Sequence, residues 1–442
     1  MRTPLARLQI FVWLSLAGSA ACATSGQVPD RSSIDSAIRT RTNAGIRVEG
    51  TNPMPPDVVI DDGLTSEEAV AIALWNSPSF QATLADLGVA RADVVEAGLL
   101  RNPVLSLLFP VGQKQLEWTL QFPIDVIWQR PKRVAAAQLN AQAVGERLVW
   151  DGLTLVAQTR TAHADTVIAD RRLQLMIENA DLVQRLASIT EARLKAGDIS
   201  ELEARTVRSD AARVQVLRRA SEHDRDLARV TLAAMLGMDA GTDRVTAVAG
   251  PTVDPAVCGP EPARLEGALA ARPDVRAAEI AIEAAAQRAR WEESRVLTFI
   301  GILDGNGTGA AANLGPGINA DIPIFSRNQG AIGRAEAEVD RAGRQYAAVR
   351  SQVIADVRSA SVRVRQAEQA IASWRDEIVP SLEVEQRQAE SAYQAGEIPL
   401  YAMLDVSRRL VDGRTRLLDA EADLHRATIA LERSMGRSCQ SR

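Results

Sequence analysis

Three residues in the C-terminal part of the chain combine polar chemistry with a regular spacing. Tyr401, Asp405 and Arg408 follow a break in the sequence pattern at Gly396, and four and then three positions separate them. In a helix these positions lie on one face. A phenol, a carboxylate and a guanidinium on one helix face can bind a cation or form ion pairs. The alternative interpretation is an ordinary solvated surface patch.

The other polar residues form no catalytic or metal-binding pattern. His163, His223 and His425 are isolated within helical stretches, and the sequence contains no HExxH motif, no GxSxG motif and no P-loop. We therefore expect no enzyme, no metal site and no cofactor. The 51 basic and 56 acidic residues are interspersed and leave a net charge of −5, which argues against a nucleic-acid partner.

The charged face belongs to the second of two similar segments. Three landmarks recur in the same order in both copies: an apolar segment at Phe122-Pro123-Ile124 and Pro323-Ile324-Phe325, a glycine break at Gly197 and Gly396, and a terminal glycine at Gly237 and Gly436. The number of residues from break to terminal glycine is the same in both copies. Such self-similarity indicates a duplicated unit. The first copy has Leu202, Thr206 and Ser209 at the positions of the charged face, so only the second copy is charged there.

Each copy begins with a pattern typical of β-strands. Leu116, Trp118, Leu120 and Phe122 alternate with polar residues, which predicts a strand with one apolar face, and a second strand is expected over 103–109. Corresponding strands are expected over 296–303 and 314–322. Apolar and polar alternation suits the wall of a membrane barrel, but the smallest bacterial barrels have about eight strands. If the ribbons form such a barrel, the chain must oligomerise.

Long helical stretches follow the strands. We expect a helix-turn-helix hairpin in each copy, made of 130–194 with 201–237 and of 327–394 with 400–436, and shorter helices at 65–100 (interrupted near Pro78) and 262–294. Thr65 and Glu68 form a capping box at the start of the first of these. Pro380 should kink the second long helix. The predicted fold is mainly α with a small β part, built from two tandem repeats of a strand hairpin and a long helical hairpin.

The N-terminal residues indicate export. Met1 to Ala21 has the charged and apolar regions of a secretory signal peptide. Ser19 to Cys22 resembles a bacterial lipobox, which predicts that Cys22 becomes lipid-modified; the alternative is plain cleavage in the same region. In an oxidising compartment, Cys258 and Cys439 either form a disulfide bond or remain two unpaired thiols.

These patterns divide the chain into consecutive parts. We expect an extended or poorly ordered arm after the signal peptide, then the two repeats joined by a linker rich in proline and glycine, and a short tail. The boundaries are 1–21 for the signal peptide, 22–63 for the arm, 64–238 for the first repeat, 239–261 for the linker, 262–436 for the second repeat and 437–442 for the tail.

Several local motifs add a family resemblance. The stretches from Ala270 to Glu279, Pro323 to Phe325, Tyr393 to Gly396 and Met403 to Asp405 occur in the order and spacing of the TolC-like outer-membrane efflux channels, which the chain resembles over residues 64 to 436. The resemblance implies a homotrimer with a twelve-stranded transmembrane β-barrel, continued by a periplasmic α-helical barrel.

The resemblance also implies roles for individual residues. Tyr401, Asp405 and Arg408 would form the periplasmic gate, where three copies of Asp405 make an acidic ring that Arg408 can latch. The hairpin ends would contact a periplasmic adaptor protein; these residues are Gly197, Asp198, Gly396 and Glu397.

The function expected from this resemblance is that of an exit duct. The protein would lie in the outer membrane of a Gram-negative bacterium, anchored in outer-membrane lipid at Cys22 and projecting into the periplasm. It would passively conduct substrate from an RND-type inner-membrane pump and its adaptor, with heavy-metal, cation or drug efflux as candidate roles. Two alternatives are a duct for type I protein secretion and a structural periplasmic coiled-coil lipoprotein without a pore.

Overall fold

The structure is a computed structural model that describes residues 28–47, 54–55, 58, 62–109, 111, 116–238, 245–250, 255–306 and 313–439. Among the helices in these ranges, none combines the length and the hydropathy that crossing a bilayer requires. The chain divides into two compact units. The first comprises Met1–Arg31, Thr83–Leu148 and Pro273–Val349, and the second comprises Ser32–Ala82, Val149–Arg272 and Arg350–Arg442. Each unit therefore takes part of both repeats.

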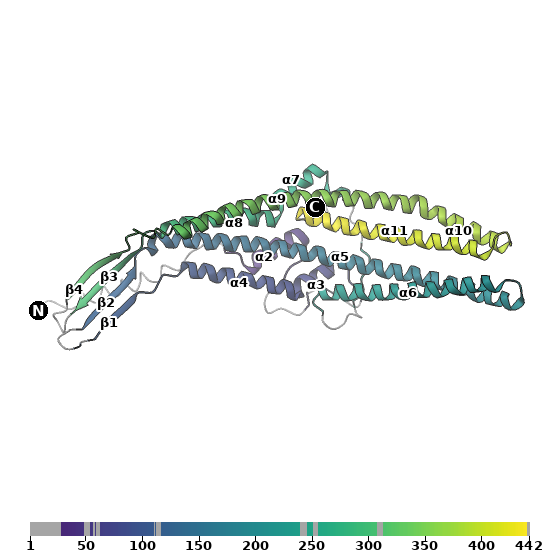
Figure 1. Cartoon of the computed structure of the whole chain (residues 1–442), viewed down its shortest axis with the longest axis horizontal. Coiled ribbons are helices and arrows are strands. Elements are labelled where there is room, and N and C mark those ends of the chain that lie inside the picture. The colour runs from purple at the N-terminus through teal and green to yellow at the C-terminus, as the bar shows by residue number, and fades with distance from the viewer. Residues whose placement is uncertain are drawn as a thin grey trace. The chain divides into compact units, whose positions relative to one another are not determined.

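The first unit contains a four-stranded antiparallel sheet (Figure 1). Its strands are β1 (Val104–Leu108), β2 (Glu117–Pro123), β3 (Phe299–Asn306) and β4 (Asn313–Ala320), and they lie in the order β1-β2-β3-β4. Each repeat supplies one hairpin, and the pairing of β2 with β3 joins the two hairpins. The four predicted strands are confirmed, with β3 starting three residues later than expected. Alternation also holds, since Thr119 donates a hydrogen bond of 2.8 Å to Asp304 across the polar face.

Two aromatic rings on the apolar face lie over glycines of the neighbouring strand. Trp118 pairs with Gly305 and Phe122 pairs with Gly301. A Cβ atom added at Gly305 would come within 2.4 Å of the Trp118 ring, and one at Gly301 within 2.5 Å of the Phe122 ring. The glycines therefore let the rings cover the strand, an arrangement that compensates for the missing glycine side chain.

Helices extend the first unit away from the sheet. It includes most of α4 (Pro78–Gly98), the first part of α5 (Val126–Ala196), α8 (Pro273–Ser294) and the first part of α9 (Gln329–Ala372). The single helix expected over 262–294 is wrong. Arg272, with φ −70° and ψ 126°, interrupts it after α7 (Glu261–Ala271), because a residue before proline avoids the helical region.

The second unit contains both helical hairpins (Figure 1). The rest of α5 turns back as α6 (Glu201–Met235), and α10 (Val379–Gln394) turns back as α11 (Leu400–Met435). Before Pro380 the helix takes a π-helical turn over Ser373–Ile378, with the Val379 N–H bonded to the Trp374 carbonyl. This wider turn is how the chain accommodates the proline.

The N-terminal segment is more ordered than its composition predicts. The extended arm expected before residue 64 is wrong for α2 (Arg31–Thr42), in which Ile34 and Ile38 are buried. Ile38 reaches α5 at Gly152, where an added Cβ would lie 2.7 Å from its Cδ1 atom. The predicted cap of α3 (Ser66–Asn76) is confirmed: Thr65 and Glu68 form a capping box.

A buried arginine joins four helical segments of the second unit. Arg272, between α7 and α8, is only 2% exposed, and its guanidinium lies 4.2 Å from the ring centre of Trp150 on α5. The same guanidinium donates to Asp356 of α9 at 3.0 Å and to the Ser434 carbonyl of α11 at 3.3 Å. A buried cation needs such partners, because an unpaired one costs several kcal/mol.

We predict that Gly305→Ala lowers the thermal stability of the sheet, because the new methyl group must displace the Trp118 ring. The loss should be about 1–3 kcal/mol, as for other overpacked sites. Gly315→Ala on β4 is the matched control, because no atom lies within 4 Å of its added Cβ. Thermal unfolding followed by tryptophan fluorescence measures both variants. Equal stability of the two would contradict the ring placement.

Candidate functional site

The ends of the two helical hairpins share one backbone design. Gly197 and Gly396 have φ values of +81° and +79°, in the left-handed region that glycine adopts without a steric penalty. In the first hairpin, the N–H groups of Gly197 and Asp198 bond to the Leu194 and Arg193 carbonyls, and the second hairpin repeats this pattern at Gly396 and Glu397. Both ends are therefore Schellman motifs. The four residues predicted to contact an adaptor, Gly197, Asp198, Gly396 and Glu397, are exposed.

The three residues of the charged face lie in the first turns of α11. Tyr401, Asp405 and Arg408 are exposed, whereas Met403 and Leu404 on the other side of the helix are buried. This places the three side chains on the solvent side of a helix whose inner side packs on the neighbouring hairpin. Val207 of α6 and Leu186 of α5 belong to that apolar cluster. The tips of the two hairpins are thus held together within one chain.

Arg408 does not pair with Asp405. Its guanidinium donates from Nη2 to Asp210 of α6 at 2.9 Å, while Asp405 is paired with Arg409 at 3.4 Å. Asp210 is buried, and its Oδ1 atom also accepts from Arg213 at 2.9 Å. One carboxylate of the first hairpin therefore holds two guanidiniums, one from each hairpin.

Asp210 is a candidate functional residue that the sequence analysis missed. It lies among Val207, Ala211 and Val214, which are all buried in α6. A carboxylate on the apolar stripe of a helix is a detectable signal, since an unpaired charge is rarely buried. The identity of its partner was not detectable, because Arg408 is 198 residues away in sequence.

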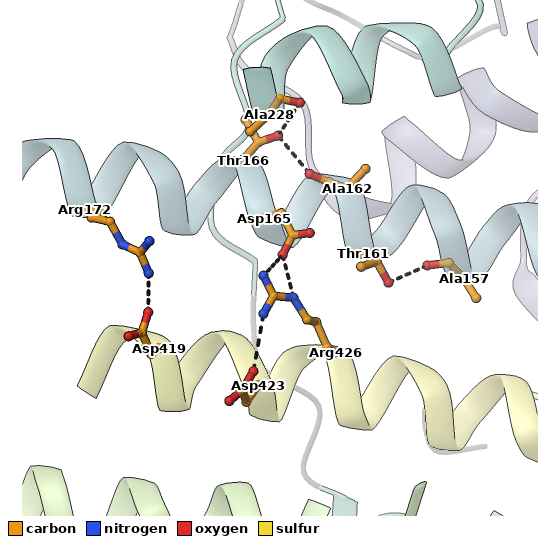
Figure 2. Close-up of polar contacts among 10 residues, drawn as sticks. All are labelled: Ala157, Thr161, Ala162, Asp165, Thr166, Arg172, Ala228, Asp419, Asp423 and Arg426. Atoms are coloured by element: carbon orange, nitrogen blue, oxygen red, sulfur yellow. Dashed lines mark hydrogen bonds and ion pairs between the residues drawn. The ribbon is translucent and has the colours of Figure 1, made fainter. Parts of the chain in front are cut away.

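Further charge pairs bridge α5 and α11 along their length (Figure 2). Arg426 of α11 reaches Asp165 of α5 at 2.8 Å and Asp423 of its own helix at 3.3 Å, and Arg172 of α5 pairs with Asp419. A pair that is largely shielded from solvent, Arg160 with Glu432 at 2.7 Å, continues the series. The first-repeat and second-repeat hairpins are therefore joined by polar contacts as well as by the apolar cluster.

Comparison with known proteins identifies the architecture. A sequence model of the family described as outer membrane efflux protein matches residues 265–437. The cobalt-zinc-cadmium resistance protein CzcC of Cupriavidus metallidurans is 24% identical over 380 residues, which span 85% of this chain and 90% of that protein. The C-terminal part of the chain, residues 265–437, thus matches the outer membrane efflux protein family.

Two further similarities agree with this assignment. The pyoverdine export outer membrane protein OpmQ of Pseudomonas putida is 26% identical over 302 residues, covering 65% of this chain and 63% of that protein. The crystal structure of the outer membrane protein VceC of Vibrio cholerae matches with a TM-score of 0.71 at 19% identity, covering 85% of this chain and 97% of that one. At that identity the structural likeness concerns the fold alone.

The three cysteines comprise one bonded pair and one residue near the N-terminus. Cys258 and Cys439 form a disulfide bond with an S–S distance of 1.99 Å and a sequence separation of 181 residues. The bond joins the linker to the residues after α11, beside a cluster that includes Leu431 and Met435. Cys22, the residue predicted to carry lipid, lies outside the described residues.

Two of the three histidines line one cavity in the second unit. His163 of α5 and His425 of α11 border a space of about 620 Å³, together with Arg160, Arg171 and Glu421. His163 is buried and bonds through Nε2 to the Leu64 carbonyl at 2.8 Å. Within the described residues, no group of three or more His, Cys, Asp or Glu side chains could hold a metal ion. The convergence of these histidines was not predicted.

Burial shifts both histidines in the same direction. Burial lowers the pKa of His163, and the nearby His425 lowers it further, against the opposing effect of the bond to Leu64. Burial also lowers the pKa of His425, although Glu421 acts in the opposite direction. The folded chain therefore favours two neutral imidazoles around this cavity.

We predict that acid destabilises the protein through His163. A lowered folded pKa means that the unfolded chain, with a histidine pKa of about 6.5, binds the proton more readily. The stability that neutral His163 contributes to the folded chain is therefore fully present above about pH 6.5, and it is lost as the pH falls below that value. His163→Gln should reduce the drop in melting temperature between about pH 8 and pH 5. His223→Gln, at an exposed position on α6, should retain the drop; identical pH profiles for the three proteins would exclude this role.

Proposed function

We propose that the protein is the outer-membrane exit duct of a tripartite efflux system, and that it passively conducts substrate from a pump to the exterior. The observation that carries the proposal is the four-stranded sheet with one apolar face, contributed by both repeats of an outer membrane efflux protein. Within the described strands, β1 and β4 each pair on one side only. Three chains joined at these edges would make a closed barrel of about twelve strands, above the minimum of eight.

The partners follow from the family. Outer membrane efflux proteins form trimers and work with a periplasmic adaptor and an inner-membrane pump. We assign adaptor contact to the exposed hairpin ends at Asp198 and Glu397, and an RND-type pump to the system. A structural lipoprotein without a pore would need no amphipathic sheet, so we disfavour that alternative.

The class of cargo is a finer proposal. The relative CzcC bears a name for cobalt, zinc and cadmium resistance and covers more of this chain than OpmQ, which is named for pyoverdine export. We propose metal cations as the cargo. The exposed Asp405 supports this, because three carboxylates around an axis favour cations.

The gate proposal keeps Tyr401, Asp405 and Arg408 at the periplasmic end of the tunnel, with altered roles. Arg408 serves as a tie between the hairpins of one chain, through Asp210. Asp405, whose side chain is 61% exposed, supplies the acidic ring. The pair of Asp405 with Arg409 is exposed, and exposed ion pairs contribute only about 0.2–1 kcal/mol each, so an adaptor can break it.

We predict that Asp405→Ala raises single-channel conductance in planar bilayers and weakens block by divalent cations from the periplasmic side. The physical reason is the loss of the acidic ring and of its pairing with Arg409. Arg408→Ala should also raise conductance, because it removes the tie to Asp210.

Thr206→Ala, at the equivalent position of Asp405 in the first repeat, is the control and should leave conductance and block unchanged. Unaltered conductance and block in Asp405→Ala would place the gate elsewhere. A correctly assembled wild-type trimer without any conductance would refute the exit-duct proposal itself.

We further propose that Cys22 is the lipidated N-terminus of the mature protein and that it anchors the duct in the outer membrane. Mass spectrometry of the N-terminal peptide should find an acylated Cys22. Cys22→Ser should still insert, because a closed barrel would hold the protein in the membrane without acyl chains. An unmodified Cys22, or cleavage at another residue, would disprove lipidation.

A further inference from the structure

A polar cavity of about 480 Å³ lies in the first unit, where the sheet meets the helices. Its lining comes from four parts of the chain: the segment between α4 and β1, the start of α5, the turn between α8 and β3, and the segment between β4 and α9. The residues with oxygen atoms that can act as ligands are Asp125, Gln129, Thr298, Asp321, Ser326 and Asn328. Both repeats contribute to this lining: the first supplies Asp125 and Gln129, and the second supplies the other four of these residues.

Asp125 is the unusual member of the set. The residue is 3% exposed, and its Oδ1 atom is buried with no hydrogen-bond partner among the described residues. A buried carboxylate oxygen without a donor or a cation is costly. Asp125 therefore calls for a positively charged or hydrogen-donating group in the cavity that it lines.

Three of the other polar side chains in the lining already donate hydrogen bonds to groups other than Asp125. Gln129 donates through Nε2 to the Ser294 carbonyl at 3.4 Å. Asn328 donates through Nδ2 to the Glu292 carbonyl at 2.8 Å and to the Glu292 carboxylate at 3.1 Å. The Thr298 hydroxyl donates to the Asp321 carboxylate. What these three side chains still offer is acceptor oxygens.

We propose that this cavity binds a hard divalent cation, with Ca²⁺ as the best-fitting ion. Carboxylates, amide carbonyls and hydroxyls are the ligands that Ca²⁺ prefers, and it accepts about six to eight oxygens in irregular geometry. Mg²⁺ demands a near-ideal octahedral geometry and usually keeps several waters, so a lining of mixed side-chain oxygens favours the more flexible Ca²⁺. With no histidine or cysteine among the lining residues, the site is poorly suited to ions that favour nitrogen or sulfur ligands. A bound ion would clamp the ends of β2 and β4 to the helices that follow them.

Two arginines also line the cavity, and a guanidinium could pair with Asp125 in place of a bound cation. Arg295 is engaged with Glu292 at 2.8 Å and stacks on Trp291 at 5.1 Å. Arg101 is exposed, and its guanidinium would satisfy Asp125 if it turned inward. If Asp125 binds Ca²⁺, Arg101→Gln should raise the affinity for Ca²⁺, because it removes a competing cation. If Arg101 instead pairs with Asp125, Arg101→Gln should only lower the stability of the protein.

The test is calorimetric titration of CaCl₂ into the purified, chelator-treated full-length protein in detergent. We expect saturable binding of about one Ca²⁺ per chain and a rise in melting temperature. Asp125→Asn should weaken binding at least about tenfold, by analogy with the loss of metal-site partners, and should abolish the rise in melting temperature. Asp93→Asn, an exposed carboxylate on α4 of the same unit, should bind as the wild type does.

Asp321→Asn provides a second variant, because this exposed residue can be changed if Asp125→Asn fails to assemble. The inference is overturned by the absence of saturable Ca²⁺ binding in the wild type, which would leave water or Arg101 as the partner of Asp125. It is also overturned by full binding in Asp125→Asn or in Asp321→Asn. These measurements require no conductance, so they stand apart from the exit-duct proposal.

Discussion

The second unit depends on the buried guanidinium of Arg272. It stacks on Trp150 and donates to Asp356 and to the Ser434 carbonyl, so it joins α5, α9 and α11 at the point where α7 gives way to α8. A guanidinium suits this position because it is planar, always charged and able to donate in several directions at once. Gly436 completes the arrangement, since an added Cβ there would lie 3.1 Å from the Arg272 side chain. The end of α11 is thereby packed against the junction that follows α7.

The two repeats share a backbone plan but differ in the chemistry of their side chains. Both hairpins end in a Schellman motif around a glycine with positive φ. Near these ends, however, the first copy has a buried Asp210, while the second has Arg408 and Arg409. A single acidic residue in one copy can therefore pair with a basic residue in the other, and the pair from Arg408 to Asp210 is such a contact. Divergence between copies has thus produced complementarity inside one chain.

Patterns local in sequence predicted much of the fold. The alternation from Leu116 to Phe122 predicted β2, and Thr65 with Glu68 predicted the start of α3, because both signals act over a few residues. The partners of Arg272, Arg408 and His163 were not predictable, since each lies about 80 to 200 residues away in sequence and no local period encodes such a meeting. Helix α2 was missed for another reason. Its polar composition hid two buried isoleucines, Ile34 and Ile38, of which Ile38 packs at Gly152 of α5.

The disulfide between Cys258 and Cys439 has a mechanical consequence. It joins the linker before the second repeat to the residues just after α11. Consider a pulling force applied between the first repeat and the C-terminal end of the chain. It would pass through the two sulfur atoms and would bypass the second repeat, which lies between two cysteines with a sequence separation of 181 residues. The second repeat therefore carries none of this force, and a pull that unfolds the first repeat leaves the second as a closed covalent loop.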